Sequence, residues 1–236
     1  MGVSWLGSIC RVETELPLVA LTFDDGPFEA NTAAVLDVLR ERDARATFFV
    51  LGRRSQLEPG LVRQLVAANH EIGLHGTNHL DLTRTSMLGI YRDLAGGRRL
   101  VQDIAGVDVD LCRPPYGTQD RRSLFVTRAL GMRSVAWSAS PRDFLALTID
   151  DHVRIIRREI GCGGIVLLHD GPPRVPNHRA AMVEAVLDLL DELSLEPTTV
   201  GDLLQRGRVV TRKGVYRRAA AREDEMSPLL LTAEPD

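Results

Sequence analysis

The chain has 236 residues, of which 44% are hydrophobic, and its 29 Lys and Arg against 32 Asp and Glu give a formal net charge of −3. These are the proportions of an ordinary globular protein with enough length for one large or two small domains. The near-neutral charge excludes a general attraction to nucleic acid or anionic membrane. We therefore expect no nucleic-acid partner. No apolar run approaches the ~18 residues of a membrane-spanning helix, so we also expect no membrane span.

Cysteine usage and the N-terminal residues bear on the cellular location. Cys10, Cys112 and Cys162 are odd in number and widely spaced, so they form neither a disulfide framework nor a metal knuckle. The first ten residues lack a basic region, and glycine and serine interrupt their apolar residues, which makes a poor signal peptide. We therefore expect a cytoplasmic protein, unless an export sequence has been removed.

Strand-like and helix-like segments alternate along the chain. Short apolar runs predict strands, and segments with apolar residues at helical spacing predict helices between them. The expected strands are 16–23, 46–51, 71–74, 107–112, 134–137, 164–168 and 197–200. The expected helices begin near 31, 61, 86, 120, 149 and 180.

This alternation predicts a parallel α/β sheet with both faces covered. On pattern alone, an open doubly wound sheet and a closed barrel both fit. Chemically useful side chains fall just past the C-terminal ends of predicted strands, the edge where both folds build their sites. These residues are Asp24, Asp25, His75, Arg113 and His169.

The last part of the chain differs in composition. From about residue 206 the apolar periodicity is lost, and a series of arginines precedes an acidic run. We assign residues 1–205 to a single domain and 206–236 to an Arg-rich, flexible C-terminal tail. A solvated tail is the favoured interpretation, and attachment to an acidic partner or nucleic acid is the alternative.

Two pairs of residues suggest a metal site. His75 and His79 are four residues apart, and on a helical turn their rings could share a metal, although such a pair is weak evidence alone. Asp24 and Asp25 repel each other, so they need a counter-charge such as a metal or an arginine. Acidic pairs also commonly occur in turns and helix caps, so this pair is ambiguous by itself.

Arg113 and His169 extend this inventory. Arg113 precedes two prolines, so a rigid turn can aim its guanidinium at a carboxylate. His169 ends a buried strand, where it could also be a hydrogen-bonded core residue. Two histidines and one aspartate can hold Zn²⁺ with an open position for water, a second carboxylate can accept the water proton, and another histidine can protonate a leaving amine. The set suits amide or ester hydrolysis.

Four segments carry a family resemblance: Thr-Phe-Asp-Asp-Gly-Pro at 22–27, His-Gly-Thr-Asn-His at 75–79, Arg-Pro-Pro-Tyr-Gly at 113–117 and Leu-Leu-His at 167–169. In this order they resemble the motif series of the polysaccharide deacetylases, the NodB-homology family of metal-dependent carbohydrate esterases. The resemblance runs from about residue 18 to 204. It implies a distorted (β/α)₇ barrel that removes the acetyl group from an N-acetylated amino sugar or glycoside.

The resemblance also implies residue roles. Asp25, His75 and His79 would bind the metal, which is Zn²⁺ or another divalent cation such as Co²⁺ or Ni²⁺. Asp24 would be the general base, and Arg113 would orient it.

Further roles follow from the same resemblance. His169 would be the general acid, and Asp143 would help to set the environment of the catalytic histidine or arginine. The backbone N–H of Tyr116 would help to stabilise the oxyanion. The expected pocket residues are Leu167, which borders the acetyl methyl, Phe144 and Pro115.

One motif departs from the family pattern. Members commonly carry Asp-x-x-Asp-Trp, whereas residues 140–144 here read Ser-Pro-Arg-Asp-Phe. Ser140 replaces the first aspartate, and Phe144 replaces the tryptophan with a smaller ring that has no N–H. This change puts the shapes of the acyl pocket and its rim in doubt and makes a substrate other than chitin-like or peptidoglycan chains more plausible. Trp137, just before the motif, is interpreted as a core residue.

Two other functions stay open. One is metal-dependent hydrolysis of another non-peptide C–N amide bond on a small cytoplasmic metabolite. The other is an inactive sugar-binding module, which the altered 140–144 segment motivates. His178 and Arg179 follow His169 closely and could line the site or pair with a site carboxylate, although structural roles are favoured. The sequence predicts neither the sugar nor the oligomeric state.

Overall fold

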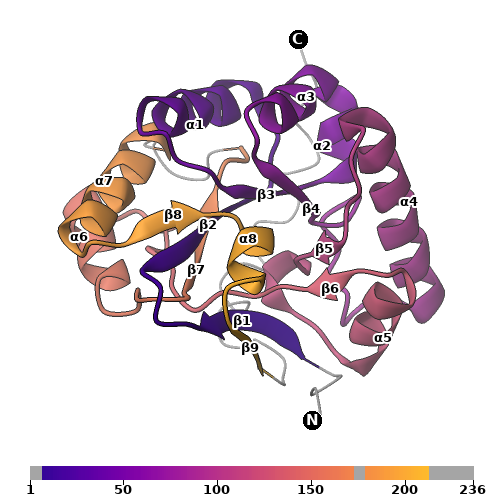
Figure 1. Ribbon diagram of the computed structural model, residues 1–236. Coiled ribbons are helices and arrows are strands. Elements are labelled where there is room, and N and C mark those ends of the chain that lie inside the picture. The colour runs from indigo at the N-terminus through magenta and orange to yellow at the C-terminus, as the bar shows by residue number, and fades with distance from the viewer. Residues whose placement is uncertain (1–6, 173–178, 213–236) are drawn as a thin grey trace.

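A curled parallel sheet lies at the centre of the computed structural model, with helices around it (Figure 1). The structure describes residues 7–172 and 179–212. The strand order is β6-β5-β4-β3-β2-β7, with β8 also paired to β2. The strands are β1 (Ser8–Glu13), β2 (Leu18–Asp24), β3 (Thr47–Val50), β4 (Glu71–Leu74), β5 (Leu111–Cys112), β6 (Arg133–Ser134), β7 (Ile165–His169), β8 (Glu196–Thr198) and β9 (Arg208–Arg212).

The sheet closes on itself through the segment that follows β6. Ala139 in this segment forms a parallel bridge with Val166 in β7, and β7 pairs in parallel with β2. β1 lies against this closure, because Ile9 bridges Val135 while β9 pairs with β1 in antiparallel register. The predicted α/β class and distorted barrel are confirmed.

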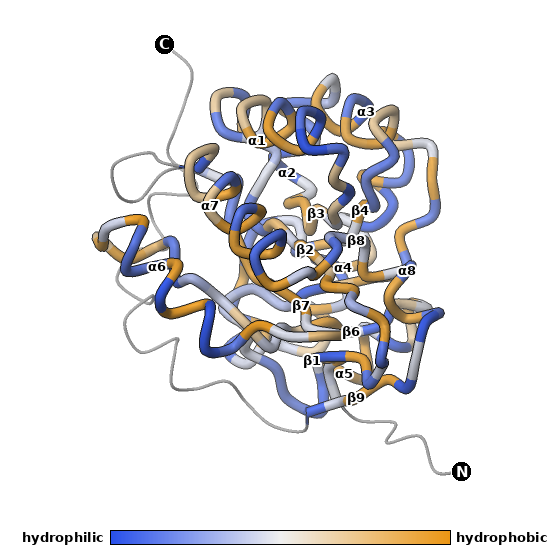
Figure 2. The backbone as a smooth tube through the Cα atoms, turned by 60° about the vertical axis from the view of Figure 1, so that its left-hand side comes forward, coloured by the Kyte–Doolittle hydropathy of each residue, from blue (hydrophilic) through white to orange (hydrophobic). Residues whose placement is uncertain are grey.

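Helices surround the sheet, and most of them, such as α1, α4 and α7, pack buried apolar residues into the core (Figures 1 and 2). Ser86 caps the longest helix by accepting a hydrogen bond from the Gly89 N–H, and Asp120 forms a capping box with Ser123. The helices are α1 (Glu29–Glu41), α2 (Gly52–Leu57), α3 (Pro59–Ala67), α4 (Met87–Ala105), α5 (Arg121–Ala129), α6 (Ile149–Ile156), α7 (Arg179–Glu192) and α8 (Val200–Leu204), and Pro115–Gly117 is a short 3₁₀ turn (η1).

Burial explains why the strands read as continuous apolar runs. All the side chains of β3 and the first four of β7 are buried, because parallel neighbours and helices cover both faces. Within the described residues, no helix is both long and apolar enough to cross a bilayer.

The structure corrects several predicted boundaries. The sequence analysis missed β1, α2 and α8. β9 falls inside the range predicted as tail, and its pairing with β1 makes residues 208–212 part of the folded domain, so the boundary at 205 lies too early. Residues 213–236, the rest of that predicted tail, lie outside the described part of the chain.

Candidate active site

The site lies at the carboxyl edge of the sheet, where the sequence analysis expected it. β2 and β7 are in register there, so that Asp24 pairs with His169. His75 directly follows β4, and Arg113 directly follows β5. Parallel strands bring these residues to one edge although they are far apart in the sequence.

Asp25, His75 and His79 converge as a possible metal-binding group. Their ligand atoms all lie within 4.8 Å of one another, and all three residues are buried. Asp25 Oδ1 lies 3.4 Å from His75 Nε2 and 3.1 Å from His79 Nε2. Burial favours a higher pKa for Asp25, but the neighbouring His79 and His75 outweigh it and hold the pKa well below its usual value.

These residues fit a divalent cation. Asp25 Oδ1 is buried and accepts no hydrogen bond from the described residues, although two imidazole nitrogens face it. A catalytic zinc site typically has three protein ligands, and two imidazoles with one carboxylate can supply them. His75 Nδ1 lies 2.8 Å from the Arg113 carbonyl oxygen, a contact that orients the ring and presents Nε2 to the cation.

The two histidines lie in a loop and not on the helical turn that their spacing suggested. Asp93 on α4 holds this loop: its carboxylate accepts hydrogen bonds from the Thr77 N–H at 3.0 Å and the Asn78 side-chain amide at 2.9 Å. The backbone between the ligands is thus fixed by a buried side chain 15 to 16 residues further along the chain. His79 itself has a positive φ of 55°.

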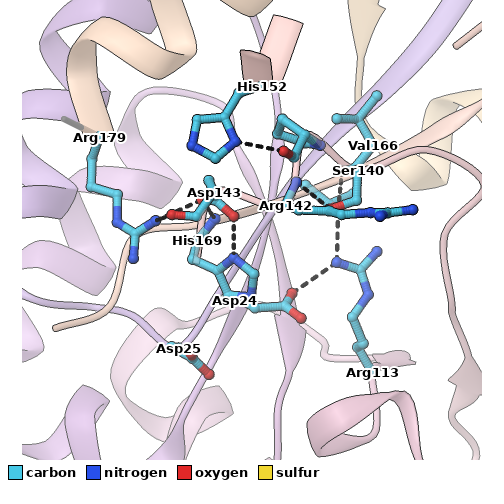
Figure 3. Close-up of polar contacts among 12 residues, drawn as sticks. Asp24, Asp25, Arg113, Ser140, Arg142, Asp143, His152, Val166, His169 and Arg179 are labelled. Atoms are coloured by element: carbon cyan, nitrogen blue, oxygen red, sulfur yellow. Dashed lines mark hydrogen bonds and ion pairs between the residues drawn. The ribbon is translucent and has the colours of Figure 1, made fainter. Parts of the chain in front are cut away.

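Asp24 stands next to the possible metal group but has its own partner. Arg113 Nη1 donates to Asp24 Oδ1 at 2.8 Å and to the Thr22 hydroxyl at 2.7 Å (Figure 3). Arg113 is completely buried, and burial lowers its pKa against the opposing effect of Asp24. The predicted pairing of Arg113 with Asp24 is present in the structure.

His169 is held by Asp143. Asp143 Oδ1 lies 2.7 Å from His169 Nδ1, while Oδ2 accepts the His169 backbone N–H at 3.0 Å. Burial favours a lower pKa for His169, but the charge and hydrogen bond of Asp143 prevail and raise the pKa to about 9. The raised pKa favours the imidazolium form, in which Nε2–H is a transferable proton.

These groups line one pocket that is open to solvent. Leu167 lines it as predicted, and so does Trp137, which corrects the assignment of Trp137 to the core alone. Pro115 and Phe144 do not belong to the lining; Phe144 packs edge-on against His169 at 5.8 Å between ring centroids. The lining residues are Asp24, Asp25, His75, His79, Tyr116, Gly117, Trp137, Leu167 and His169.

Tyr116 lies in the η1 turn with a positive φ of 60°. Its ring packs edge-on against His79, with 4.5 Å between centroids. Gly117 follows with a φ of 63°, and a Cβ there would collide with the Trp137 ring. The turn therefore needs glycine to let the indole lie against the backbone beside the cavity.

Ser140 has a local structural role. Its hydroxyl accepts the Arg142 N–H at 3.1 Å, a turn that an aspartate at this position could form in the same way. Pro141 anchors the same loop, because its carbonyl oxygen lies 2.7 Å from His152 Nδ1. The replacement of the family aspartate thus leaves Asp143 in position.

The chain belongs to the polysaccharide deacetylase family, because residues 11–135 match that family and the fold and site agree with it. It is therefore a hydrolase of the class that acts on non-peptide C–N bonds.

The chain is similar to several named deacetylases and to solved structures. The chain is 35% identical over 172 residues to a chitooligosaccharide deacetylase of Azorhizobium caulinodans, covering 72% of this chain and 82% of the relative. It is also 35% identical over 193 residues to a peptidoglycan-N-acetylglucosamine deacetylase of Bacillus cereus, covering 80% and 88%. A solved family 4 acetyl xylan esterase from Clostridium thermocellum, in complex with a cobalt ion, is 29% identical with a TM-score of 0.73, covering 80% of this chain and 90% of that one.

Two supporting residues were missed or underrated by sequence reasoning. Asp93 gave no signal, because an acidic residue on an amphipathic helix is usually solvent-exposed. Arg179 was named only as a weak candidate, yet it donates to Asp143 Oδ2 at 2.6 Å. His178, the other candidate in that stretch, lies outside the described residues.

Proposed function

We propose that this protein hydrolyses the acetamido group of an N-acetylated amino sugar, in an oligomer or polymer of N-acetylglucosamine. One observation carries the proposal: three metal-type donors, a separate carboxylate and an imidazolium line one cavity. The names of the relatives support the substrate class, because one acts on chitooligosaccharide and another on peptidoglycan N-acetylglucosamine.

Asp25, His75 and His79 are the residues that would hold the cation, with zinc as the first candidate and cobalt or nickel as alternatives. When bound, a divalent cation polarises the acetyl carbonyl and acidifies a water molecule. Asp24 would accept a proton from the attacking water, because Arg113 fixes its carboxylate beside the ligand group and not within it.

His169, which lines the same cavity, completes the reaction as the proton donor. As an imidazolium it donates its Nε2 proton to the sugar nitrogen while the C–N bond breaks, which releases acetate and a free amine. The Tyr116 backbone N–H is the proposed donor to the oxyanion, and Leu167 with Trp137 would surround the acetyl methyl group. The overall reaction converts the acetamide and one water molecule into acetate and an amine.

Acetate release from N-acetylglucosamine oligomers tests this proposal. We expect activity that a chelator abolishes and added Zn²⁺ or Co²⁺ restores. Asp24→Asn should lower kcat by about a thousandfold while leaving metal affinity intact, because Asp24 is a base and not a ligand. Asp37→Asn on the exposed face of α1 is the matched control and should match the parent protein.

Two results would contradict the proposal. One is the absence of acetate release from any acetamido sugar by the metal-loaded protein. The other is equal inertness of the parent and Asp24→Asn proteins with retained glycan binding, which would identify an inactive binding module. A panel of non-sugar N-acyl compounds tests the alternative of another C–N amide substrate. The predicted cytoplasmic location stays a prediction, which fractionation of cells making the chain would test.

A further inference from the structure

Arg179 belongs to a chain of charges that leads to the proposed general acid. It is the first residue of α7 and only 7% exposed. Its Nη1 donates to Asp143 Oδ2 at 2.6 Å and to the Asp143 carbonyl oxygen at 3.2 Å. On the other side of the same carboxylate, Oδ1 faces His169 Nδ1 at 2.7 Å, so that Asp143 lies between the two cations (Figure 3).

The physical need for a second cation follows from the burial of Asp143, which is only 5% exposed. A buried carboxylate is costly unless a positive charge compensates it. His169 compensates Asp143 only while it carries its proton, and in the proposed reaction it gives that proton away. Arg179 keeps its charge throughout, because a guanidinium does not deprotonate at working pH.

We propose that Arg179 is a positioning residue that keeps Asp143 ionised and in place when His169 loses its proton, and that it makes His169 a stronger acid toward the leaving amine. This inference rests on the proposed function. Without Arg179, only the imidazolium would compensate the charge of Asp143. His169 would then hold its proton more tightly.

The charges facing His169 agree with an acid-strengthening effect of Arg179. Asp143 at the end of its loop and Asp25 after β2 both favour the imidazolium, whereas Arg179 on α7 opposes them. Arg179 also helps to lower the pKa of Asp143, against the effect of burial and together with His169. The Phe144 ring packs on His169 without adding a charge.

The test is an NMR titration of His169 in the full-length, metal-loaded protein, using ¹³C-labelled histidine and His169→Asn to assign the resonance. Arg179→Gln keeps a hydrogen-bond donor but removes the charge, and should raise the His169 midpoint by about one pH unit. Arg179→Lys keeps the charge and should leave the midpoint within a few tenths of a unit. With substrate, the alkaline limb of kcat for Arg179→Gln should move upward equally, with kcat falling about three- to tenfold and KM unchanged.

Arg157→Met is the matched control, because Arg157 pairs with Glu192 at the far, exposed end of α7. This substitution should shift neither the His169 midpoint nor the alkaline limb of kcat. An unchanged midpoint in Arg179→Gln, or an equal shift in Arg179→Lys, would overturn the inference. If Arg179→Gln does not fold, the Arg179→Lys titration decides alone, and a shift of a full unit there contradicts the inference. The titration needs no substrate, so failure of the proposed deacetylation is distinguishable from failure of the Arg179 role.

Discussion

The buried aspartates of the site differ in what compensates their charge, and this difference assigns their roles. Asp25 faces two imidazole nitrogens, Asp24 faces the guanidinium of Arg113, and Asp143 faces His169. A carboxylate surrounded by lone-pair donors suits a cation, whereas one already paired with arginine stays available as a base. Neighbouring residues of one type are therefore suited to the different roles proposed for them.

The Asp143–His169 pair gives a prediction for pH dependence. The imidazolium must be present for proton donation, so the activity of the parent protein should fall above a pH of about 9, the pKa of His169. Asp143→Asn removes the anion that favours the imidazolium, so the pKa of His169 falls toward 6.5 and the alkaline limb should move to lower pH, with kcat at pH 8 reduced about thirtyfold. A pH–rate profile measures both.

The exposed Asp151→Asn on α6 serves as the control and should leave the profile unchanged. An alkaline limb that stays at the same pH in Asp143→Asn would show that His169 is not the titrating acid.

At the scale of elements, α4 matters for the metal site although none of its residues is a ligand. Its Asp93 carboxylate binds the backbone of the loop between His75 and His79. A short loop without helical hydrogen bonds needs such an outside partner to keep two imidazoles aimed at one point.

Asp93→Ala should therefore weaken Zn²⁺ binding by about ten- to a hundredfold, as measured by calorimetry. Asp103→Ala, an exposed position on the same helix, should leave the affinity unchanged. Equal affinity in both variants would mean that the loop holds its shape without α4. Circular dichroism of the metal-free proteins separates a lost clamp from a lost fold.

At the scale of the whole molecule, the barrel depends on close backbone contact where β1 meets the turn before β7. Val12 N–H donates to the Gly163 carbonyl at 2.8 Å, and Gly163 N–H donates to the Leu18 carbonyl at 2.7 Å. Gly163 has a φ of 72°, and a Cβ there would collide with the Val12 carbonyl oxygen. Only glycine fits this junction.

Gly163→Ala should lower the free energy of unfolding by roughly 2 kcal/mol or more, because it combines a left-handed backbone with a clash. Gly161→Ala in the same turn meets no atom within 4 Å and should change it by less than about 0.5 kcal/mol. Urea unfolding followed by circular dichroism measures the difference. Similar losses in the two variants would contradict this account of the junction.

The sequence by itself determined the α/β class, most strand positions and the candidate metal, base and acid residues. It could do so because apolar runs mark strands buried on both faces, and because the residues after these runs gather at one sheet edge. The division of those residues into metal ligands, base and acid came from the resemblance to the family. Ser140 and Phe144 also showed from the sequence alone where this chain departs from its family.

Only the tertiary structure decided how those residues are supported. Sequence spacing suggested a helical turn for His75 and His79, but a contact from α4 fixes a loop instead. Arg179 and Trp137 became part of the site because chain closure brings α7 and the segment after β6 to the cavity. Periodicity indicates which face of an element is buried, whereas contacts between residues distant in sequence depend on how the elements pack. The strand β9 was missed because it is formed by pairing with β1 and needs no apolar run.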